Sequence, residues 1–255
     1  ISACLVGSEM CIRDRYRKMN RVSRAIIMAA GYGNRMLPIT RNIPKPLIKV
    51  NGTAMIETII RALLANNIEE IYIVVGYLKE QFKSLAEKYP MISLIENPYF
   101  DSCNNISSLY AAREYLEEAM ILDGDQVIYN EKILSPYFQH SGYNCVWAED
   151  DTEEWLLTTE ANRIISCSRT GGRQGWQLYS ISRWTKDDGM RLRKHLEQEF
   201  DIHKNRQIYW DDIPIFCYPE EYELEVYPMK SQDVREIDSV EELATIDESY
   251  RKYIM

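Results

Sequence analysis

The chain has 255 residues, with 39 acidic and 30 basic side chains and a formal net charge of −9. Hydrophobic residues make up 45% of it and charged residues 27%, which is ordinary for a soluble globular protein and excludes disordered, collagen-like and disulfide-rich chains. The acidic balance argues against a nucleic-acid partner. No apolar run approaches the roughly 20 residues that span a bilayer, so we expect no membrane insertion and a cytoplasmic protein.

The cysteines show no spacing typical of metal ligands, and the three histidines do not complete such a pattern. We therefore expect reduced thiols with structural roles and no zinc site. The six positions are Cys4, Cys11, Cys103, Cys145, Cys167 and Cys217.

The first fifteen residues, ISACLVGSEMCIRDR, have neither a periodic pattern nor a helix cap. They resemble a translated sequencing adapter and give no evidence of a signal peptide. We predict that residues 1–20 are a non-native or disordered head without function. Residues 21–250 are expected to form one domain.

Apolar runs alternate with helical patterns through the first half of the domain. The runs lie at 25–30, 71–77, 92–95 and 119–125. The helical patterns lie at 53–67, from the end of the second run to about residue 89, and at 107–118. Strands and helices that alternate at this spacing favour right-handed βαβ units. The sequence therefore predicts an α/β, Rossmann-like domain with a mostly parallel sheet flanked by helices.

The pattern changes after residue 140. Short β-like runs at 145–148, 155–159, 164–168 and 176–181 indicate an antiparallel insertion added to the sheet, with helices near 185–200 and 239–250. No linker or repeat separates the halves, which is why we expect a single domain.

A glycine-rich loop follows the first strand. Gly31 and Gly33 leave the backbone free to present N–H donors to phosphate oxygens, although this spacing alone also fits an ordinary turn. Arg35 follows closely, and Lys45 stands between two prolines that restrict its loop. Two cations placed in this way favour a site for a triphosphate over a simple turn.

These residues resemble the nucleotidyltransferase family that joins a nucleoside triphosphate to a phosphorylated small molecule and releases pyrophosphate. The family pattern, Ala-Ala-Gly-x-Gly-x-Arg followed by Pro-Lys-Pro/Ala-Leu, is matched at 29–35 and 44–47. The resemblance runs from about residue 24 to 247. It implies the nucleotidyltransferase fold, with a nucleotide-binding half at 24–140 and an acceptor-binding half at 141–250. By this likeness Ala30, Gly31 and Gly33 wrap the triphosphate, and Arg35 and Lys45 act catalytically on its phosphates.

Two aspartates end the fourth apolar run. Asp123 and Asp125 share one face if the strand persists, at the edge of the sheet where α/β proteins bind ligands. Asp125 suits Mg²⁺, whereas Asp123 is expected on the nucleotide side, orienting water or backbone. The resemblance adds Asp238 as the second metal ligand, because it matches the family's Glu-Ile-Asp-Ser/Thr element. The neighbouring Ser239 and Glu242 form a capping box.

Further nucleotide contacts are implied by the same likeness. The family places an Asn-rich element near the nucleotide, which here contains Asn105 and Ser108, although these side chains could simply cap the following helix. Gly76 and Tyr77 end the second strand on the expected nucleotide side.

The acceptor half contains aromatic residues beside carboxylates, a combination that can hold a trimethylammonium group by cation–π attraction. Packing alone also explains any one tryptophan. The segments resemble the choline side of bacterial phosphocholine cytidylyltransferases, which implies an acceptor site made of Glu154, Trp155, Trp184, Tyr209, Trp210 and Asp211.

The resemblance implies an Mg²⁺-dependent enzyme that condenses CTP with phosphocholine to give CDP-choline and pyrophosphate, by in-line attack on the α-phosphorus. Fusion to, or cooperation with, a choline kinase is also implied. The alternative acceptors are 2-aminoethylphosphonate, phosphoethanolamine and a sugar 1-phosphate. A non-catalytic nucleotide-binding module is disfavoured by the presence of Arg35, Lys45, Asp125 and Asp238.

Overall fold

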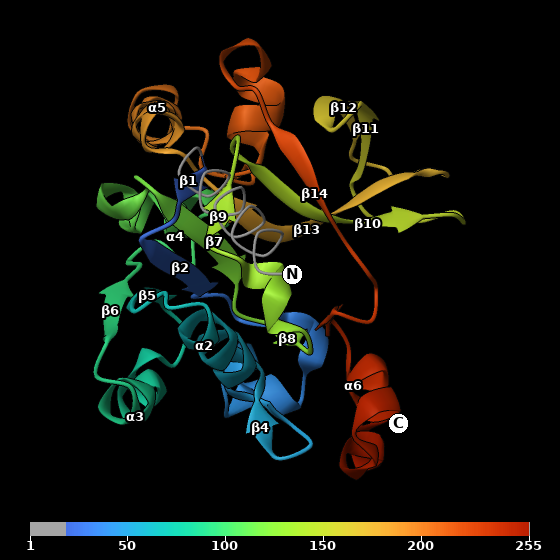
Figure 1. Cartoon of the computed structure of the whole chain (residues 1–255). Helices are drawn as coiled ribbons and strands as arrows, with labels where there is room; N and C mark the ends of the chain where they lie inside the picture. The colour runs from blue at the N-terminus through green and yellow to red at the C-terminus, as the bar shows by residue number, and fades with distance from the viewer. Residues whose placement is uncertain (1–18, 255) are drawn as a thin grey trace, which may run out of the picture.

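The computed structural model describes residues 19–254, where nine strands form one mixed sheet (Figure 1). Its centre is a parallel set in the order β7, β2, β5 and β6. These strands span Ala119–Asp123, Arg24–Ala29, Glu70–Val75 and Ile92–Glu96. The predicted α/β fold with a parallel sheet is confirmed.

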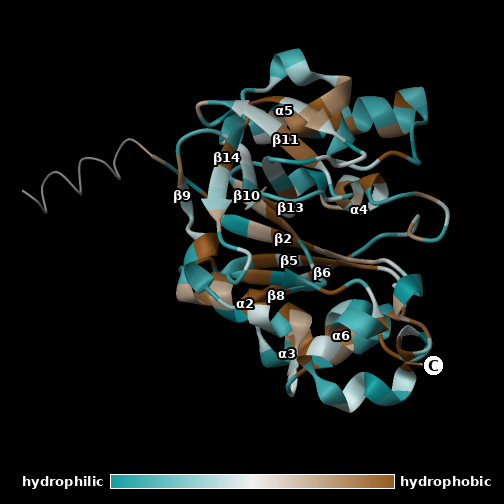
Figure 2. Ribbon diagram, turned by 90° about the vertical axis from the view of Figure 1, so that its right-hand side faces the viewer, coloured by the Kyte–Doolittle hydropathy of each residue, from teal (hydrophilic) through white to brown (hydrophobic). Residues whose placement is uncertain are grey.

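Alternate side chains of β2 pack against helices on opposite faces of the sheet. Ile27 belongs to a cluster with α2 and α3, whereas Ile26 and Met28 belong to a cluster with α4 and α5. These helices span Met55–Ala65, Lys83–Lys88, Ile106–Ala111 and Lys186–Glu197. Burial on both faces explains the continuous apolar runs, and the central strands are mainly brown in Figure 2.

The second half of the chain extends the same sheet. Strand β13 pairs antiparallel with β7, and β10 pairs antiparallel with β13 and parallel with β14. Strand β11 pairs antiparallel with both β12 and β13. These strands span Gly142–Ala148, Leu156–Glu160, Arg163–Ser168, Gly175–Arg183 and Glu225–Met229. The predicted antiparallel insertion is therefore present, with β14 as a strand that the sequence pattern did not indicate.

Three short strand pairs complete the β structure. They are β1 (Asn20–Arg21) with β9 (Tyr137–Phe138), β3 (Lys49–Val50) with β4 (Thr53–Ala54), and β8 (Gln126–Ile128) with β15 (Val234–Glu236). Most of the expected head, residues 1–18, lies outside the described part of the chain. Asn20, which we placed in the head, is instead paired with Phe138 in the two-stranded β1–β9 sheet.

The remaining helices are short. They are α6 (Val240–Ile246), the π-helices η7 (Gln198–His203) and η8 (Ile213–Cys217), and the 3₁₀ turns η1 (Asn34–Met36), η2 (Ile39–Arg41), η3 (Lys45–Leu47), η4 (Lys79–Phe82), η5 (Arg113–Tyr115), η6 (Glu131–Leu134), η9 (Pro219–Glu221) and η10 (Glu248–Tyr253). No helix within residues 19–254 combines the length and apolar character needed to cross a bilayer. Four of the cysteines, from Cys103 onward, are free thiols.

A third, smaller apolar cluster joins the C-terminal segment to the glycine-rich loop. Met36 and Ile237 are fully buried in it, together with Leu243 of α6. Arg35 precedes Met36 in the chain, and Asp238 follows Ile237. The cluster therefore brings Arg35 close to Asp238, although the two are far apart in the sequence.

Candidate active site

The glycine-rich loop leaves β2 and turns at Gly33. This residue has φ 65°, a left-handed conformation that favours glycine, and the Thr40 hydroxyl donates to its carbonyl oxygen at 2.9 Å. A Cβ at this position would lie 3.0 Å from side-chain atoms of both Thr40 and Lys45. Glycine is therefore required both by the backbone and by the close approach of Lys45.

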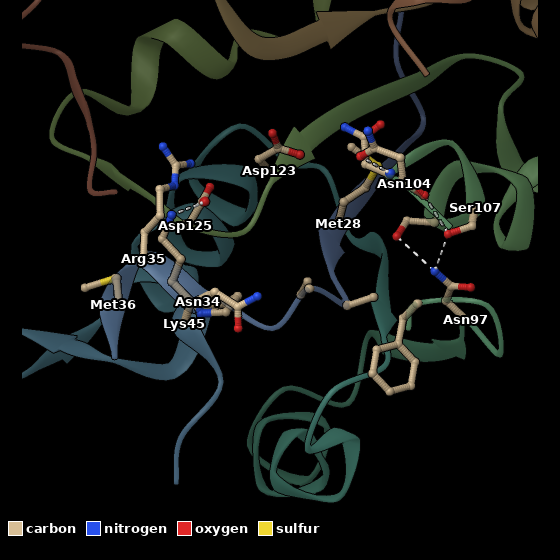
Figure 3. Close-up of a pocket in the computed structure, with 18 of the residues that line it drawn as sticks. Met28, Asn34, Arg35, Met36, Lys45, Asn97, Asn104, Ser107, Asp123 and Asp125 are labelled. Atoms are coloured by element: carbon tan, nitrogen blue, oxygen red, sulfur yellow. Dashed lines mark hydrogen bonds and ion pairs between the residues drawn. The ribbon is translucent and has the colours of Figure 1, made fainter. Parts of the chain in front are cut away.

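Two cations from the loop after β2 meet two carboxylates from distant parts of the chain. The ammonium of Lys45 donates to Oδ2 of Asp125 at 2.6 Å and to Oδ1 of Asp238 at 2.8 Å. The guanidinium of Arg35 donates to the same Asp238 oxygen at 2.8 Å. Figure 3 shows Arg35, Lys45 and Asp125 together on one side of the pocket.

Lys45 is only 8% exposed, yet it keeps its charge. Burial alone would lower the pKa of Lys45, but the charges and hydrogen bonds of Asp125 and Asp238 outweigh that effect and raise it above its ordinary value. Arg35, by contrast, keeps 72% of its side chain exposed. The site thus offers one fixed buried cation and one accessible cation to an anionic substrate.

A carboxylate that the sequence analysis did not select joins this cluster. Oxygen atoms of Asp125, Glu236 and Asp238 all lie within 4.8 Å of one another, an arrangement that can hold a metal ion. Burial first, and then the charge of Asp125, holds the pKa of Glu236 well above its ordinary value. Glu236 stands two residues before Asp238 in the same extended segment, so the period of a strand could have indicated it.

The donor set fits a hard divalent cation such as Mg²⁺. All three side chains offer carboxylate oxygens, the ligands that Mg²⁺ prefers, and Oδ1 of Asp125 is buried without a hydrogen-bond partner among the described residues. A divalent ion can therefore be held by Asp125, Glu236 and Asp238.

Asp123 ends β7 between the two sides of the pocket (Figure 3). Burial and then the negative charge of Asp125 raise the pKa of Asp123 to about 7, against a hydrogen bond from Ser180. The structure places its carboxylate near the metal-ligand candidates without including it among them.

The pocket has a volume of about 380 Å³ and is lined by most of the residues that were predicted to bind the nucleotide. Its lining includes Ala30, Gly31, Gly33, Arg35, Lys45, Asn105, Ser108, Asp123, Asp125 and Asp238. Asn97 and Phe100 also line it and were not predicted. Asn97 follows β6 directly, so its place at the carboxyl end of a parallel strand was the signal that could have identified it.

Gly76 and Tyr77, which were predicted on the nucleotide side, are not among the residues that line the pocket. A Cβ at Gly76 would lie 2.6 Å from the Phe100 ring, so this glycine makes room for a residue that does line the pocket. The amide of Tyr77 donates to the Ala30 carbonyl at 3.0 Å and its hydroxyl donates to the Arg41 carbonyl at 3.1 Å. These contacts hold the glycine-rich loop in position.

The Asn-rich element lies across the pocket from Lys45 (Figure 3). The amide of buried Asn97 donates to the hydroxyls of Ser107 and Ser108 at 3.0 and 3.2 Å. Oδ1 of Asn105 accepts from the Trp210 backbone N–H at 2.9 Å. This last bond ties the nucleotide side to the segment that carries the predicted acceptor residues.

Three of the six predicted acceptor residues are buried and expose almost no side-chain surface to solvent. The side chains of Trp184 and Trp210 are fully buried, with ring centroids 6.0 Å apart in the core. In this conformation neither ring face is open to a ligand. Asp211 is also buried, and burial followed by the charge of Asp123 holds its pKa well above its ordinary value, against a hydrogen bond from the Tyr143 hydroxyl.

The other predicted acceptor residues lie nearer to solvent. Tyr209 is 49% exposed and its ring centroid lies 5.7 Å from that of Trp155. Glu154 is exposed, and its backbone N–H donates to the Thr152 hydroxyl at 3.1 Å. Trp155 and Tyr209 are thus the two predicted aromatic residues that are brought together with accessible surface.

The site combines the glycine-rich loop, two cations and a carboxylate cluster at the carboxyl end of a parallel sheet. This combination defines a nucleotidyltransferase. Residues 25–199 match the MobA-like NTP transferase domain, and the chain belongs to that family. It is an enzyme of the nucleotidyltransferase class.

Individual relatives are cytidylyltransferases. A 2-aminoethylphosphonate cytidylyltransferase from Lancefieldella rimae is 40% identical over 230 residues, covering 89% of this chain and 93% of its own length. A choline-phosphate cytidylyltransferase from Streptococcus pneumoniae is 31% identical, covering 88% and 97%. The solved CTP:phosphocholine cytidylyltransferase from that organism superposes with a TM-score of 0.81 at 30% identity, covering 91% of this chain and all of its own. Cytidylyltransferase activity is therefore supported.

Proposed function

We propose that this protein transfers a cytidylyl group from CTP to 2-aminoethylphosphonate and releases pyrophosphate. The observation that carries the transfer reaction is the meeting of Arg35, Lys45, Asp125 and Asp238 within hydrogen-bond distance beside the glycine-rich loop. The 40% identity to a relative with this named activity supports the acceptor.

In the proposed reaction, a phosphonate oxygen attacks the α-phosphorus of CTP while pyrophosphate leaves on the opposite side. No covalent protein intermediate is needed, so the protein contributes positioning and charge neutralisation. Lys45 holds the triphosphate from within the pocket, and Arg35 contacts it from the exposed rim. Asp125, Glu236 and Asp238 would hold Mg²⁺, which supplies further neutralisation of the phosphate charge when bound.

The acceptor differs from the phosphocholine expected from the sequence. A trimethylammonium group donates no strong hydrogen bond and needs open aromatic faces, but two of the four predicted aromatic residues, Trp184 and Trp210, are fully buried, which leaves only Trp155 and Tyr209 of that set. A primary ammonium instead needs hydrogen-bond acceptors, and the exposed Glu154 can supply carboxylate oxygens on the acceptor-binding half. Both observations support the aminoalkyl phosphonate.

Phosphocholine is the second candidate, because two choline-phosphate cytidylyltransferases are 31% and 33% identical and cover most of their length. The discriminating experiment measures pyrophosphate release with Mg²⁺ and CTP against 2-aminoethylphosphonate, phosphocholine, phosphoethanolamine and glucose 1-phosphate. We expect 2-aminoethylphosphonate to give the highest kcat/KM. A higher value for phosphocholine would overturn the acceptor assignment. UTP, ATP and GTP replace CTP in parallel reactions, and activity equal to that with CTP would overturn the nucleotide assignment.

A further inference from the structure

Three aromatic side chains form a corner on the acceptor-binding half. Trp155 precedes β11, Tyr209 precedes η8, and Phe216 lies within η8. The ring centroid of Trp155 lies 5.7 Å from that of Tyr209 and 5.5 Å from that of Phe216, in both cases nearly perpendicular, at 82°. Perpendicular rings leave faces that can bind a cation from two sides.

A cation of the chain itself already occupies this corner. The guanidinium carbon of Arg169 lies 4.0 Å from the centre of the Phe216 ring and 5.6 Å from that of Trp155. Arg169 comes from the segment after β12 and retains half of its side-chain exposure. The rings are therefore in contact with a positive charge before any ligand binds.

The same guanidinium has a buried counter-ion. Nη2 of Arg169 donates to Oδ1 of Asp212, whose side chain is only 4% exposed. The other oxygen of Asp212 accepts from the Tyr209 backbone N–H at 2.9 Å, which fixes the carboxylate against the aromatic corner. Two ring faces and a buried carboxylate are the groups that a quaternary ammonium would require.

We propose that Arg169 is a specificity-determining residue that fills a cation site formed by Trp155, Phe216 and Asp212 and thereby excludes quaternary ammonium acceptors. A second cation at these rings would be repelled by the guanidinium and would find the carboxylate already paired. The inference rests on the proposed function, because it assumes that the acceptor carries an amine.

The proposal also specifies the acceptor class. Glu154 adjoins Trp155 in the chain and is exposed, so its carboxylate oxygens are accessible to a ligand. A primary ammonium can donate a hydrogen bond to such an oxygen, whereas a trimethylammonium cannot. Small primary amines that carry a phosphonate or phosphate are thus favoured.

The test compares Arg169→Ala and Arg169→Lys with wild type. Removing the guanidinium frees the rings and Asp212, so R169A should bind tetramethylammonium chloride on the order of tenfold more tightly in calorimetric titrations. The ratio of kcat/KM for phosphocholine to that for 2-aminoethylphosphonate should rise by a similar factor. R169K keeps a cation and should resemble wild type in both measurements.

Arg173→Ala is the matched control, because Arg173 lies in the same connection and is exposed, with Asp150 at 4.0 Å and a long hydrogen bond of 3.4 Å from its Nε to the Glu149 carbonyl oxygen. Arg169→Gln replaces R169A if circular dichroism shows that R169A is unfolded. An unchanged affinity for tetramethylammonium in the neutral variants, or an equal gain in R169K or R173A, overturns the proposal.

Failure of the proposed function is recognised separately. If wild type releases no pyrophosphate with any nucleotide and acceptor, the transferase assignment is wrong, but the tetramethylammonium titration still decides the role of Arg169. If wild type is active and the titration shows no gain, the transferase assignment stands and Arg169 does not determine specificity.

Discussion

The ammonium of Lys45 and the carboxylate of Asp125 meet at 2.6 Å, although the first comes from a proline-flanked loop and the second from the turn that follows the central strand β7. Both side chains are mostly buried, so this ion pair is screened less than a surface pair. Asp238 accepts from the same ammonium at 2.8 Å. The three groups form a charged unit that holds an anionic substrate and its metal in one place.

Asp125→Asn and Asp238→Asn should lower kcat for pyrophosphate release by about 10²–10³, the usual effect of removing one electrostatic group from an active site. The change keeps side-chain volume but removes a charge that both Lys45 and the metal require. Circular dichroism should show an unchanged fold. Lys83→Ala, which breaks an exposed pair with Glu80, is the control and should keep wild-type turnover. Near-normal rates in either Asn variant would contradict the metal assignment.

Gly33→Ala should reduce both stability and activity. The left-handed backbone costs a non-glycine residue about 1–2 kcal/mol, and the new methyl group would lie 3.0 Å from the Lys45 Cβ. Urea unfolding and CTP kinetics measure the two effects. Gly52→Ala is matched to it, because Gly52 also has positive φ but open space around its Cβ. It should lose stability alone, so equal loss of turnover in both variants would argue against displacement of Lys45.

The sequence predicted those features of the fold that depend on residues close together in the chain. The apolar run from Ala25 to Ala29 is buried on both faces of a parallel strand, and the glycine-rich loop follows at the carboxyl end of that strand, as expected. Ser239 and Glu242 were likewise expected to form a capping box, and both of its hydrogen bonds are present. Such features depend on neighbours within a few residues.

Features that depend on long-range packing were not predictable. The burial of Trp184 and Trp210 follows from how β13 and the segment before η8 pack together, which no periodic pattern encodes. Arg169 was not identified, because its ring contacts and its carboxylate come from two other segments. The predicted helix at 107–118 is instead α4, which ends at Ala111, followed by the separate turn η5.

Glu242→Ala should weaken the affinity for the metal without removing a metal ligand. Oε2 of Glu242 accepts from the backbone N–H of Asp238 at 2.7 Å, so the capping box orients that carboxylate. Groups that orient metal ligands typically contribute about 10–100-fold to affinity, so the Mg²⁺ concentration for half-maximal rate should rise within that range. Ser239→Ala should destabilise the protein by about 1 kcal/mol through loss of the cap. Glu241→Ala, at an exposed neighbouring position, should change neither quantity, and a similar rise in its Mg²⁺ requirement would contradict the argument.

His195 should make the free energy of unfolding depend on pH. Its ring is 1% exposed, stacks on Tyr218 with centroids 3.8 Å apart, and shares a 2.8 Å hydrogen bond with the Tyr222 hydroxyl. Burial lowers the pKa of His195 below its ordinary value of 6.5, although the nearby charge of Glu221 opposes this shift. Lys194 and Arg191 act in the same direction as burial, and Glu199 opposes it.

The sign of the effect follows from the proton balance. Below pH 6.5 the unfolded chain binds a proton at this histidine that the folded chain does not, so stability is fully present above that value and is lost as pH falls toward the folded-state pKa. His195→Gln removes the titrating group, so its unfolding free energy in urea should decline less than that of wild type between about pH 7.5 and 5.5. Parallel pH dependences of the two proteins would show that His195 does not carry this linkage.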